Sequence, residues 1–199
     1  MSRIVLLLEE YSMKVLLDSL LPRLFPNLEF LCVPHEGKND LARSIPRKLR
    51  AWREPGVRFV VVRDNDGANC LALKAELVKL CNDGGRDDTL VRIACQELEA
   101  WYFGDPESLA EAFDEPLLRT IGNKARFRDP DSVQQPATAL AELAPAFQKV
   151  SGARAMGPRL TPTRNTSRSF LAFVAGIERI SGREPEAEQG GLFGDTEED

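Results

Sequence analysis

The stretch that decides the fold is FVVVRDNDGANC, residues 59–70. It begins with four apolar residues, as a buried strand does, and continues with Asp64 and Asp66, separated by one residue and followed by a glycine. Asp, Asn and Gly are typical of a turn that follows a strand, because they tolerate left-handed backbone. Two carboxylates at this spacing are also typical ligands of a divalent cation. Both interpretations stay open until the surroundings of the two acids are considered.

Apolar runs of the same kind recur on both sides of this stretch and alternate with segments of helical periodicity. The expected strands are residues 3–8, 28–33, 57–63 and 89–95, and the expected helices are residues 12–24, 38–52, 68–82, 106–113, 137–149 and 167–180. Strands that are apolar throughout and alternate with helices predict right-handed βαβ units. We therefore expect an α/β protein with a parallel sheet, helices on both faces and a mostly helical C-terminal part.

The pattern changes after about residue 104. We expect an α/β core over residues 1–104, a helical extension packed on it over 105–181, and a disordered acidic tail over 182–199. No apolar run is long enough to cross a membrane, and Glu9 and Glu10 follow the first one where a cleavage site would stand. The four cysteines lack metal-binding spacing, which favours reduced thiols and a cytoplasmic location.

Charge is unevenly distributed, so the overall net charge of −5 is misleading. Residues 181–199 hold seven acidic residues against Arg183, and residues 119–169 hold nine basic residues against three acidic ones. A basic segment with a net charge of +6 is compatible with binding to nucleic acid, although the whole chain is acidic.

Polar residues follow each predicted strand. In chain order these are Glu9 and Glu10, His35 to Lys38, Asp64 and Asp66, and Glu97 and Glu99. The carboxyl ends of parallel strands meet at one edge of a sheet, so acids from three strands should gather there. Gathered acids repel one another, and a hard cation such as Mg²⁺ or Mn²⁺ is their natural counter-charge. On extended backbone Asp64 and Asp66 would point the same way and could share that ion.

Basic residues could bind a substrate phosphate beside this site. Lys38 follows a glycine at the predicted start of a helix, where it is either a phosphate contact or a surface lysine. Residues 152–170, GARAMGPRLTPTRNTSRSF, carry Arg154, Arg164 and Arg168 as candidate phosphate contacts. The alternative is a solvated loop before the last helix. The single histidine, His35, is expected to be structural.

Two sets of residues resemble a known family. Glu9 after the first strand and the Asp64/Asp66 pair after the third resemble the TOPRIM domain of topoisomerases, primases and OLD-type nucleases. More narrowly, PHEGKNDL at 34–41, ELEAW at 97–101 and the segment 152–170 look like a TOPRIM-like bacterial family, domain of unknown function 4276. This resemblance covers about residues 3–180 and implies a Rossmann-like TOPRIM sheet.

The resemblance also implies a magnesium-dependent phosphoryl-transfer site. In it, Glu9 would do general acid–base work, and Asp64 and Asp66 would hold metal. At least one of Glu97 and Glu99 would complete the acidic site, and Glu9 is also a candidate metal ligand. Some relatives are the nuclease half of anti-phage systems that act beside an ABC-type ATPase. The implied partners are therefore nucleic acid, DNA or RNA, and an ATPase.

The leading hypothesis is a magnesium-dependent nuclease, and two alternatives stay open. Many relatives have a glycine and a later acid where this chain has Glu10 and Met13, which would fit a regulatory module whose site has decayed. The stretch VVVRDNDGAN also resembles the opening of haloacid-dehalogenase-type phosphatases, with Asp64 as nucleophile and Asp66 as acid–base. Against that alternative, Ala68 replaces the usual threonine and the motif follows the third strand.

Overall fold

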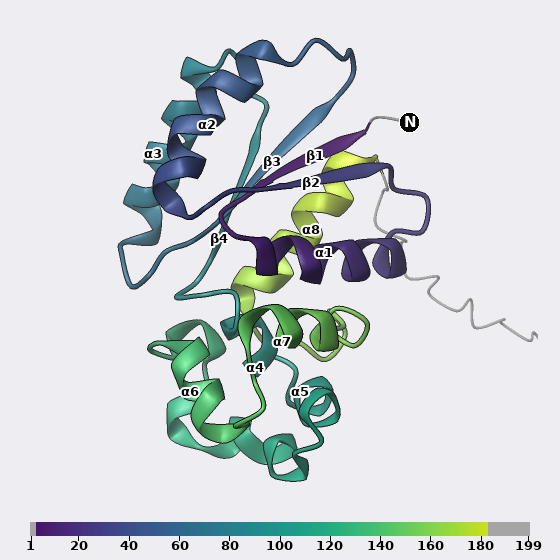
Figure 1. Ribbon diagram of the computed structural model, residues 1–199, viewed down its shortest axis with the longest axis vertical. Coiled ribbons are helices and arrows are strands. Elements are labelled where there is room, and N and C mark those ends of the chain that lie inside the picture. The colour runs from purple at the N-terminus through teal and green to yellow at the C-terminus, as the bar shows by residue number, and fades with distance from the viewer. Residues whose placement is uncertain (1–2, 183–199) are drawn as a thin grey trace, which may run out of the picture.

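A four-stranded parallel sheet forms the centre of the computed structural model, which describes residues 3–182 (Figure 1). The strands lie in the order β2-β1-β3-β4. Their bounds are β1 Ile4–Leu8, β2 Phe30–Pro34, β3 Arg58–Asp64 and β4 Leu90–Ala94. All five residues of β1 are buried, as expected for a central strand covered on both faces. The predicted parallel α/β sheet is confirmed.

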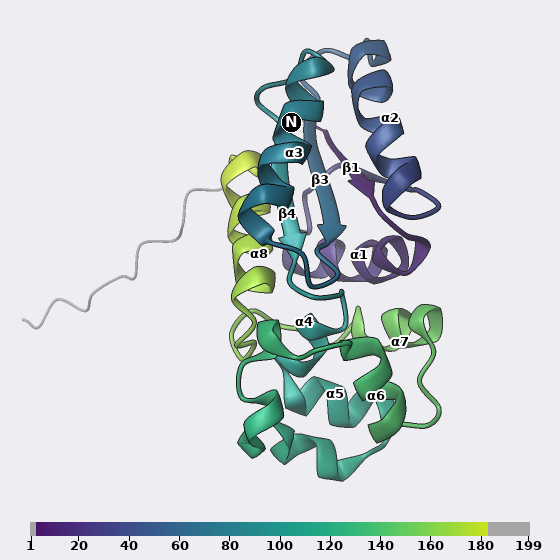
Figure 2. The same ribbon diagram turned by 90° about the vertical axis from the view of Figure 1, so that its left-hand side faces the viewer.

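Helices cover both faces of this sheet (Figures 1 and 2). Helices α1 (Tyr11–Leu24) and α8 (Arg168–Ser181) pack on one face, and α2 (Lys38–Ala51) and α3 (Cys70–Asp83) on the other. Side chains alternate along a strand, so β1 contributes to two separate cores. One core contains Ile4, Leu6 and Leu8 of β1, and the other contains Val5 and Leu7.

The helical part, residues 100–165, lies beyond the carboxyl ends of the strands (Figure 2). It contains the short helices α4 (Ala100–Phe103), α5 (Pro106–Phe113), α6 (Pro136–Leu143) and α7 (Lys149–Met156), and the 3₁₀ segments Pro116–Asn123, Ala125–Phe127 and Pro130–Ser132. Trp101 of α4 is fully buried, with ring centroids 5.4 Å from Phe170 and 5.1 Å from Phe173 of α8. The helical part therefore shares one core with α1 and α8, and this shared core holds it next to the edge of the sheet where the strands end.

The main differences from the expected elements are a shorter helix after residue 136 and two helices, α4 and α7, that were not expected. The helix expected over 137–149 ends at Leu143, because Pro145 disfavours helical backbone at Ala144, which has φ −132° and ψ 89°. A separate helix, α7, begins at Lys149, the last residue of the expected helix, and continues to Met156 in the segment where a solvated loop was the alternative. The tail predicted to be disordered, residues 182–199, lies outside the described residues except for Gly182, which caps α8. No helix within residues 3–182 is long and apolar enough to cross a membrane.

Candidate functional site

The strand order reverses between β1 and β3, and acidic residues stand at the carboxyl ends of these two strands. Parallel sheets of this kind bind ligands at such a reversal point. Glu9 is the first residue after β1, and Asp64 is the last residue of β3. Glu99, which follows β4 by five residues, immediately precedes α4. The three residues are 9%, 3% and 0% exposed, so the fold buries three carboxyl groups at one edge of the sheet.

Glu9 is held by the neighbouring strand β3. Its Oε2 accepts a hydrogen bond from the backbone N–H of Asp64 (3.1 Å) and lies 3.8 Å from Nε of Arg63, an ion pair too long for a hydrogen bond. Burial and the charge of Asp66 raise the pKa of Glu9, and the Asp64 N–H and Arg63 oppose that rise. Glu9 is therefore fixed in place yet able to take up a proton more readily than an ordinary glutamate.

Asp64 and Glu99 have carboxyl oxygens with no hydrogen-bond partner among residues 3–182. These atoms are Oδ1 of Asp64 and both Oε1 and Oε2 of Glu99, and the buried hydroxyl of Tyr102 is also unpaired. Burial and the charges of Glu99 and Glu9 raise the pKa of Asp64 well above its ordinary value. Burial raises the pKa of Glu99 to about 7. Unpaired oxygens in such surroundings call for either a proton or a cation.

The oxygen atoms of these carboxylates suit Mg²⁺ or Mn²⁺. Among residues 3–182, no group of three or more His, Cys, Asp and Glu side chains is placed so that it could hold one metal ion. Mg²⁺ is commonly held by only one or two carboxylates, with water and substrate phosphate as its other ligands. The unpaired oxygens of Asp64 and Glu99 fit such a site.

Asp66 and Asp64 have different surroundings, and the expectation that they point the same way on extended backbone is wrong. Asp66 has a left-handed backbone with φ 47°, which breaks the alternation of the strand. Its side chain is 41% exposed and forms an ion pair with Nζ of Lys38 (3.1 Å). Lys38, the first residue of α2, thus stands beside the edge of the sheet, where a phosphate contact was predicted.

Lys149 was not predicted as a site residue. It is the first residue of α7, and its Nζ lies 3.2 Å from Oε2 of Glu10, which also accepts a hydrogen bond from Ser12. Although burial opposes its charge, the carboxylates of Glu99 and Glu10 raise the pKa of Lys149. Lys149 is one of nine basic residues in a long segment, and only the tertiary structure places it against acids that follow β1 and β4.

Glu97 has a hydrogen-bond partner within the described residues, unlike Glu99. Its Oε2 accepts a hydrogen bond from the backbone N–H of Ala137 (2.8 Å), in the first turn of α6. Glu97 and Asp66 line a small polar pocket of about 200 Å³ between the loop after β3 and the start of α6. The structure thus divides the candidate ligands into a buried set, Glu9, Asp64 and Glu99, and an outer set, Asp66 and Glu97.

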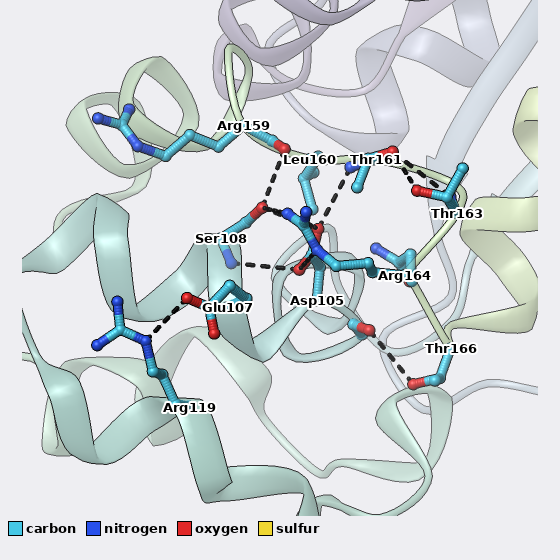
Figure 3. A network of polar contacts seen from close by, with 12 residues as sticks. Asp105, Glu107, Ser108, Arg119, Arg159, Leu160, Thr161, Thr163, Arg164 and Thr166 are labelled. Atoms are coloured by element: carbon cyan, nitrogen blue, oxygen red, sulfur yellow. Dashed lines mark hydrogen bonds and ion pairs between the residues drawn. The ribbon is translucent and has the colours of Figure 1, made fainter.

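The predicted phosphate-binding arginines have different surroundings. Arg164 forms an ion pair with the buried Asp105 (3.3 Å) and donates to the Ser108 hydroxyl, as Figure 3 shows. Arg168 forms an ion pair with Asp129 on the surface (3.1 Å). Arg154 is exposed on α7. The structure therefore gives Arg164 a role in neutralising a buried acid.

His35 contacts the backbone of β1. Its Nδ1 is 2.8 Å from the Leu8 carbonyl oxygen, and its ring is largely buried. The contact ties the end of β2 to the end of β1, which fits the structural role expected for this histidine.

The strand order, the helices on both faces and the acids at the reversal point define a TOPRIM-like α/β protein. The same fold occurs in the C-terminal regions of the OLD proteins of Xanthomonas campestris pv. campestris and Burkholderia pseudomallei. Each aligns with a TM-score of 0.50 and 16% sequence identity over 90% of this chain, which covers 96% and 99% of those two chains respectively.

The chain belongs to the family described as Domain of unknown function (DUF4276), whose model matches residues 8–178. The predicted family is therefore confirmed. No curated protein matches the chain in sequence.

Proposed function

We propose that this protein is a magnesium-dependent nuclease that hydrolyses phosphodiester bonds, with Mn²⁺ as a substitute for Mg²⁺. The observation that carries the proposal is the buried pair Asp64 and Glu99, whose oxygens lack partners within the described residues at the reversal point of a TOPRIM-like sheet. The fold shared with the OLD C-terminal regions is consistent with it.

Each carboxylate has a distinct role in the proposal. When bound, Mg²⁺ would supply positive charge to the scissile phosphate and would lower the pKa of an attacking water. Asp64 and Glu99 would hold the ion with their free oxygens, and Asp66 and Glu97 would contribute from the outer side. Glu9, fixed by the Asp64 N–H and with a raised pKa, would position the water and accept its proton.

Basic residues around the edge would hold the polyanion. Lys38 lies beside Asp66, and Lys149 lies beside Glu10. The segment 119–169 adds a net charge of +6 on the side of the molecule beyond the strand ends. A negatively charged backbone would thus meet cations around a metal-holding centre, which supports nucleic acid as the substrate.

The substitution Asp64→Asn tests the proposal. It removes a metal-binding charge with almost no change in size, so Mg²⁺-stimulated cleavage of plasmid DNA or RNA should fall to the background rate. The matched control is Asp88→Asn, an exposed acid in the loop that leads into β4 at the other end of the sheet, which should cleave like the wild type. Circular dichroism checks that both variants are folded. Undiminished cleavage by folded Asp64→Asn would contradict the assignment.

One observation favours a regulatory module that binds without cutting. Met13 stands where many relatives have an acid. It is fully buried in the hydrophobic core beneath α1, and its side chain supplies no metal ligand. Calorimetric titration of Mg²⁺ discriminates between the two functions. An intact site should release or absorb heat on binding Mg²⁺, and Asp64→Asn should abolish that heat. A decayed site should give the same result for the wild type and for Asp64→Asn. A burst of phosphate from an aryl phosphate would instead favour the phosphatase alternative.

We also infer a role in antiviral defence beside an ABC-type ATPase, on the basis of family resemblance. Co-purification of the chain with an ATPase expressed from the same bacterial operon, with cleavage dependent on that partner, would support the inference. Full, unregulated cleavage by the isolated chain would argue against control by a partner.

A further inference from the structure

Two cysteines from different elements meet beside the DxD loop, residues 65–69. Cys70 is the first residue of α3, and Cys95 directly follows β4. Their Sγ atoms are 3.7 Å apart. We propose that Cys70 and Cys95 form a reversible disulfide that closes across the DxD loop. This proposal rests on the two thiols themselves and is independent of the nuclease function.

The geometry permits the bond. A disulfide has a sulfur–sulfur distance near 2.05 Å, so the two atoms need to approach by only about 1.7 Å. Each residue stands at the end of its element, where a loop begins or ends and can absorb this shift. Both thiols are half-buried and line a pocket of about 390 Å³ between α3, β4 and α8, so a small reactant can reach them.

The other two cysteines provide an internal comparison. Cys32 of β2 is buried in the core that α1 covers, and Cys81 of α3 is buried in the core on the other face of the sheet. Burial raises the pKa of both thiols, that of Cys81 to about 11. Because these thiols belong to different cores on opposite faces of the sheet, neither is expected to join the proposed disulfide.

Hydrogen bonds couple the thiol pair to the acidic loop. Nδ2 of Asn65, which lies between the two aspartates, donates to Sγ of Cys70 (3.1 Å). The backbone N–H of Asn65 donates to the Ala94 carbonyl (3.2 Å), and that of Asp66 donates to the Gln96 carbonyl (3.0 Å). The DxD loop is thus hydrogen-bonded both to the start of α3 and to the segment after β4. The disulfide would join these same two segments, so it would restrain the backbone that carries Asp66.

Thiol–disulfide exchange with a small anionic disulfide, such as oxidised glutathione, supplies the chemistry. Three basic residues, Lys74, Arg92 and Arg168, and one acid, Asp131, line the pocket, and this excess of positive charge favours a negatively charged reactant.

The reaction balances in two steps. The Cys70 thiolate attacks the small disulfide, forms a mixed disulfide and releases one glutathione thiolate. Cys95 then loses its proton to solvent and displaces the second glutathione thiolate. The two protein sulfurs are oxidised, and one glutathione disulfide is reduced to two thiols.

Thiol mapping of the full chain over a series of glutathione disulfide to glutathione ratios tests the proposal. Free thiols should fall from the four of the sequence to two, with a Cys70–Cys95 cross-linked peptide in the mass spectrum, and dithiothreitol should restore all four. Cys70→Ser and Cys95→Ser should form no cross-link, and the remaining thiol should accumulate as a mixed disulfide with glutathione. The proposal would be overturned if the wild type kept four free thiols at glutathione disulfide to glutathione ratios that modify either variant. A cross-link to Cys32 or Cys81 would also overturn it.

Hydrogen exchange tests the coupling to the DxD loop. Amides of residues 65–69 should exchange more slowly in the oxidised chain than in the reduced one, whereas those of the distant α5 should be unchanged. Equal exchange of residues 65–69 in both forms would show that the disulfide does not restrain the loop.

Discussion

Glu99 is the residue whose charge state matters most at the edge of the sheet. Neither of its carboxyl oxygens has a hydrogen-bond partner within residues 3–182, and burial raises its pKa from 4.5 to about 7. Between these two pH values the folded chain keeps a proton that the unfolded chain releases. The contribution of Glu99 to stability therefore falls as pH rises from about 4.5 to about 7.

We expect Glu99→Gln to stabilise the protein in the absence of metal, because glutamine has the same shape without the buried charge. The free energy of unfolding at pH 8 should rise by about 1–3 kcal/mol, and the gain should vanish near pH 4.5. Urea unfolding at the two pH values measures this difference. Glu111→Gln, on the exposed side of α5, is the control and should have little effect at either pH. A destabilisation by Glu99→Gln at pH 8 would mean that its charge is already compensated.

Arg154 and Arg164 are close in sequence but differ in their partners, so they should respond differently to truncation. Arg164→Ala leaves the buried Asp105 without its cation and should cost about 1–2 kcal/mol of stability, since solvent around the half-exposed guanidinium weakens the pair. Arg154→Ala should change stability by less than about 0.5 kcal/mol but weaken binding to nucleic acid. Urea unfolding and fluorescence anisotropy measure the two effects. If Arg164→Ala weakened binding to nucleic acid and left stability unchanged, Arg164 would be the phosphate contact.

At the level of elements, the close packing of α7 on α1 brings Lys149 to the site. Gly157 caps the end of α7, and a Cβ there would lie 2.8 Å from Cβ of Ser19 and 2.9 Å from the Leu16 carbonyl oxygen. Only glycine allows this approach without a shift of one helix. The other end of α7 carries Lys149 to Glu10.

Gly157→Ala should therefore push α7 away from α1. We expect a loss of about 1–3 kcal/mol in the free energy of unfolding, as for other overpacked sites. Gly122→Ala is the matched control, because its new Cβ would have its nearest neighbour 3.9 Å away. Thermal unfolding of the two variants compares them. Equal stability of both would mean that α7 can move at little cost, and the ion pair of Lys149 would then depend on α7 only weakly.

At the scale of the whole molecule, charge separation is the main feature. Residues 183–199 carry seven acidic residues and one arginine, so removing them changes the net charge from −5 to +1. The basic segment 119–169 would then act without a competing polyanion in the same chain. The effect on binding follows from counterion release and should depend on salt.

Deletion of residues 183–199 should tighten binding to nucleic acid at low salt, with a smaller difference at high salt. Fluorescence anisotropy over a salt series measures both affinities. The control is the full-length chain with the seven acids of the tail replaced by the corresponding amides. If charge is the cause, this control should bind nucleic acid with the same affinity as the deletion variant. If only the deletion binds more tightly, the effect of the tail would be steric.

Local patterns predicted most of the fold. Four apolar runs alternating with helical periodicity were enough for a parallel sheet, because burial on both faces makes a strand apolar throughout. The same reasoning placed Glu9, Asp64 and Glu99 near one edge, because parallel strands end at the same side. It was wrong about the helix over 137–149, where Pro145 outweighed the periodicity, and about Asp66, where a left-handed residue turned the side chain away.

The sequence by itself determined the sheet and the edge at which the acids collect, since hydrophobic periodicity and strand polarity are properties of nearby residues. The family followed from the resemblance of short segments, residues 34–41, 97–101 and 152–170. Only the tertiary structure decided which acids are buried without partners among residues 3–182, that Lys149 pairs with Glu10, and that Cys70 meets Cys95. The reason is physical. Burial and charge pairing depend on elements far apart in the chain, such as α7 packed on α1 and β4 beside β3, and no local pattern records those distances.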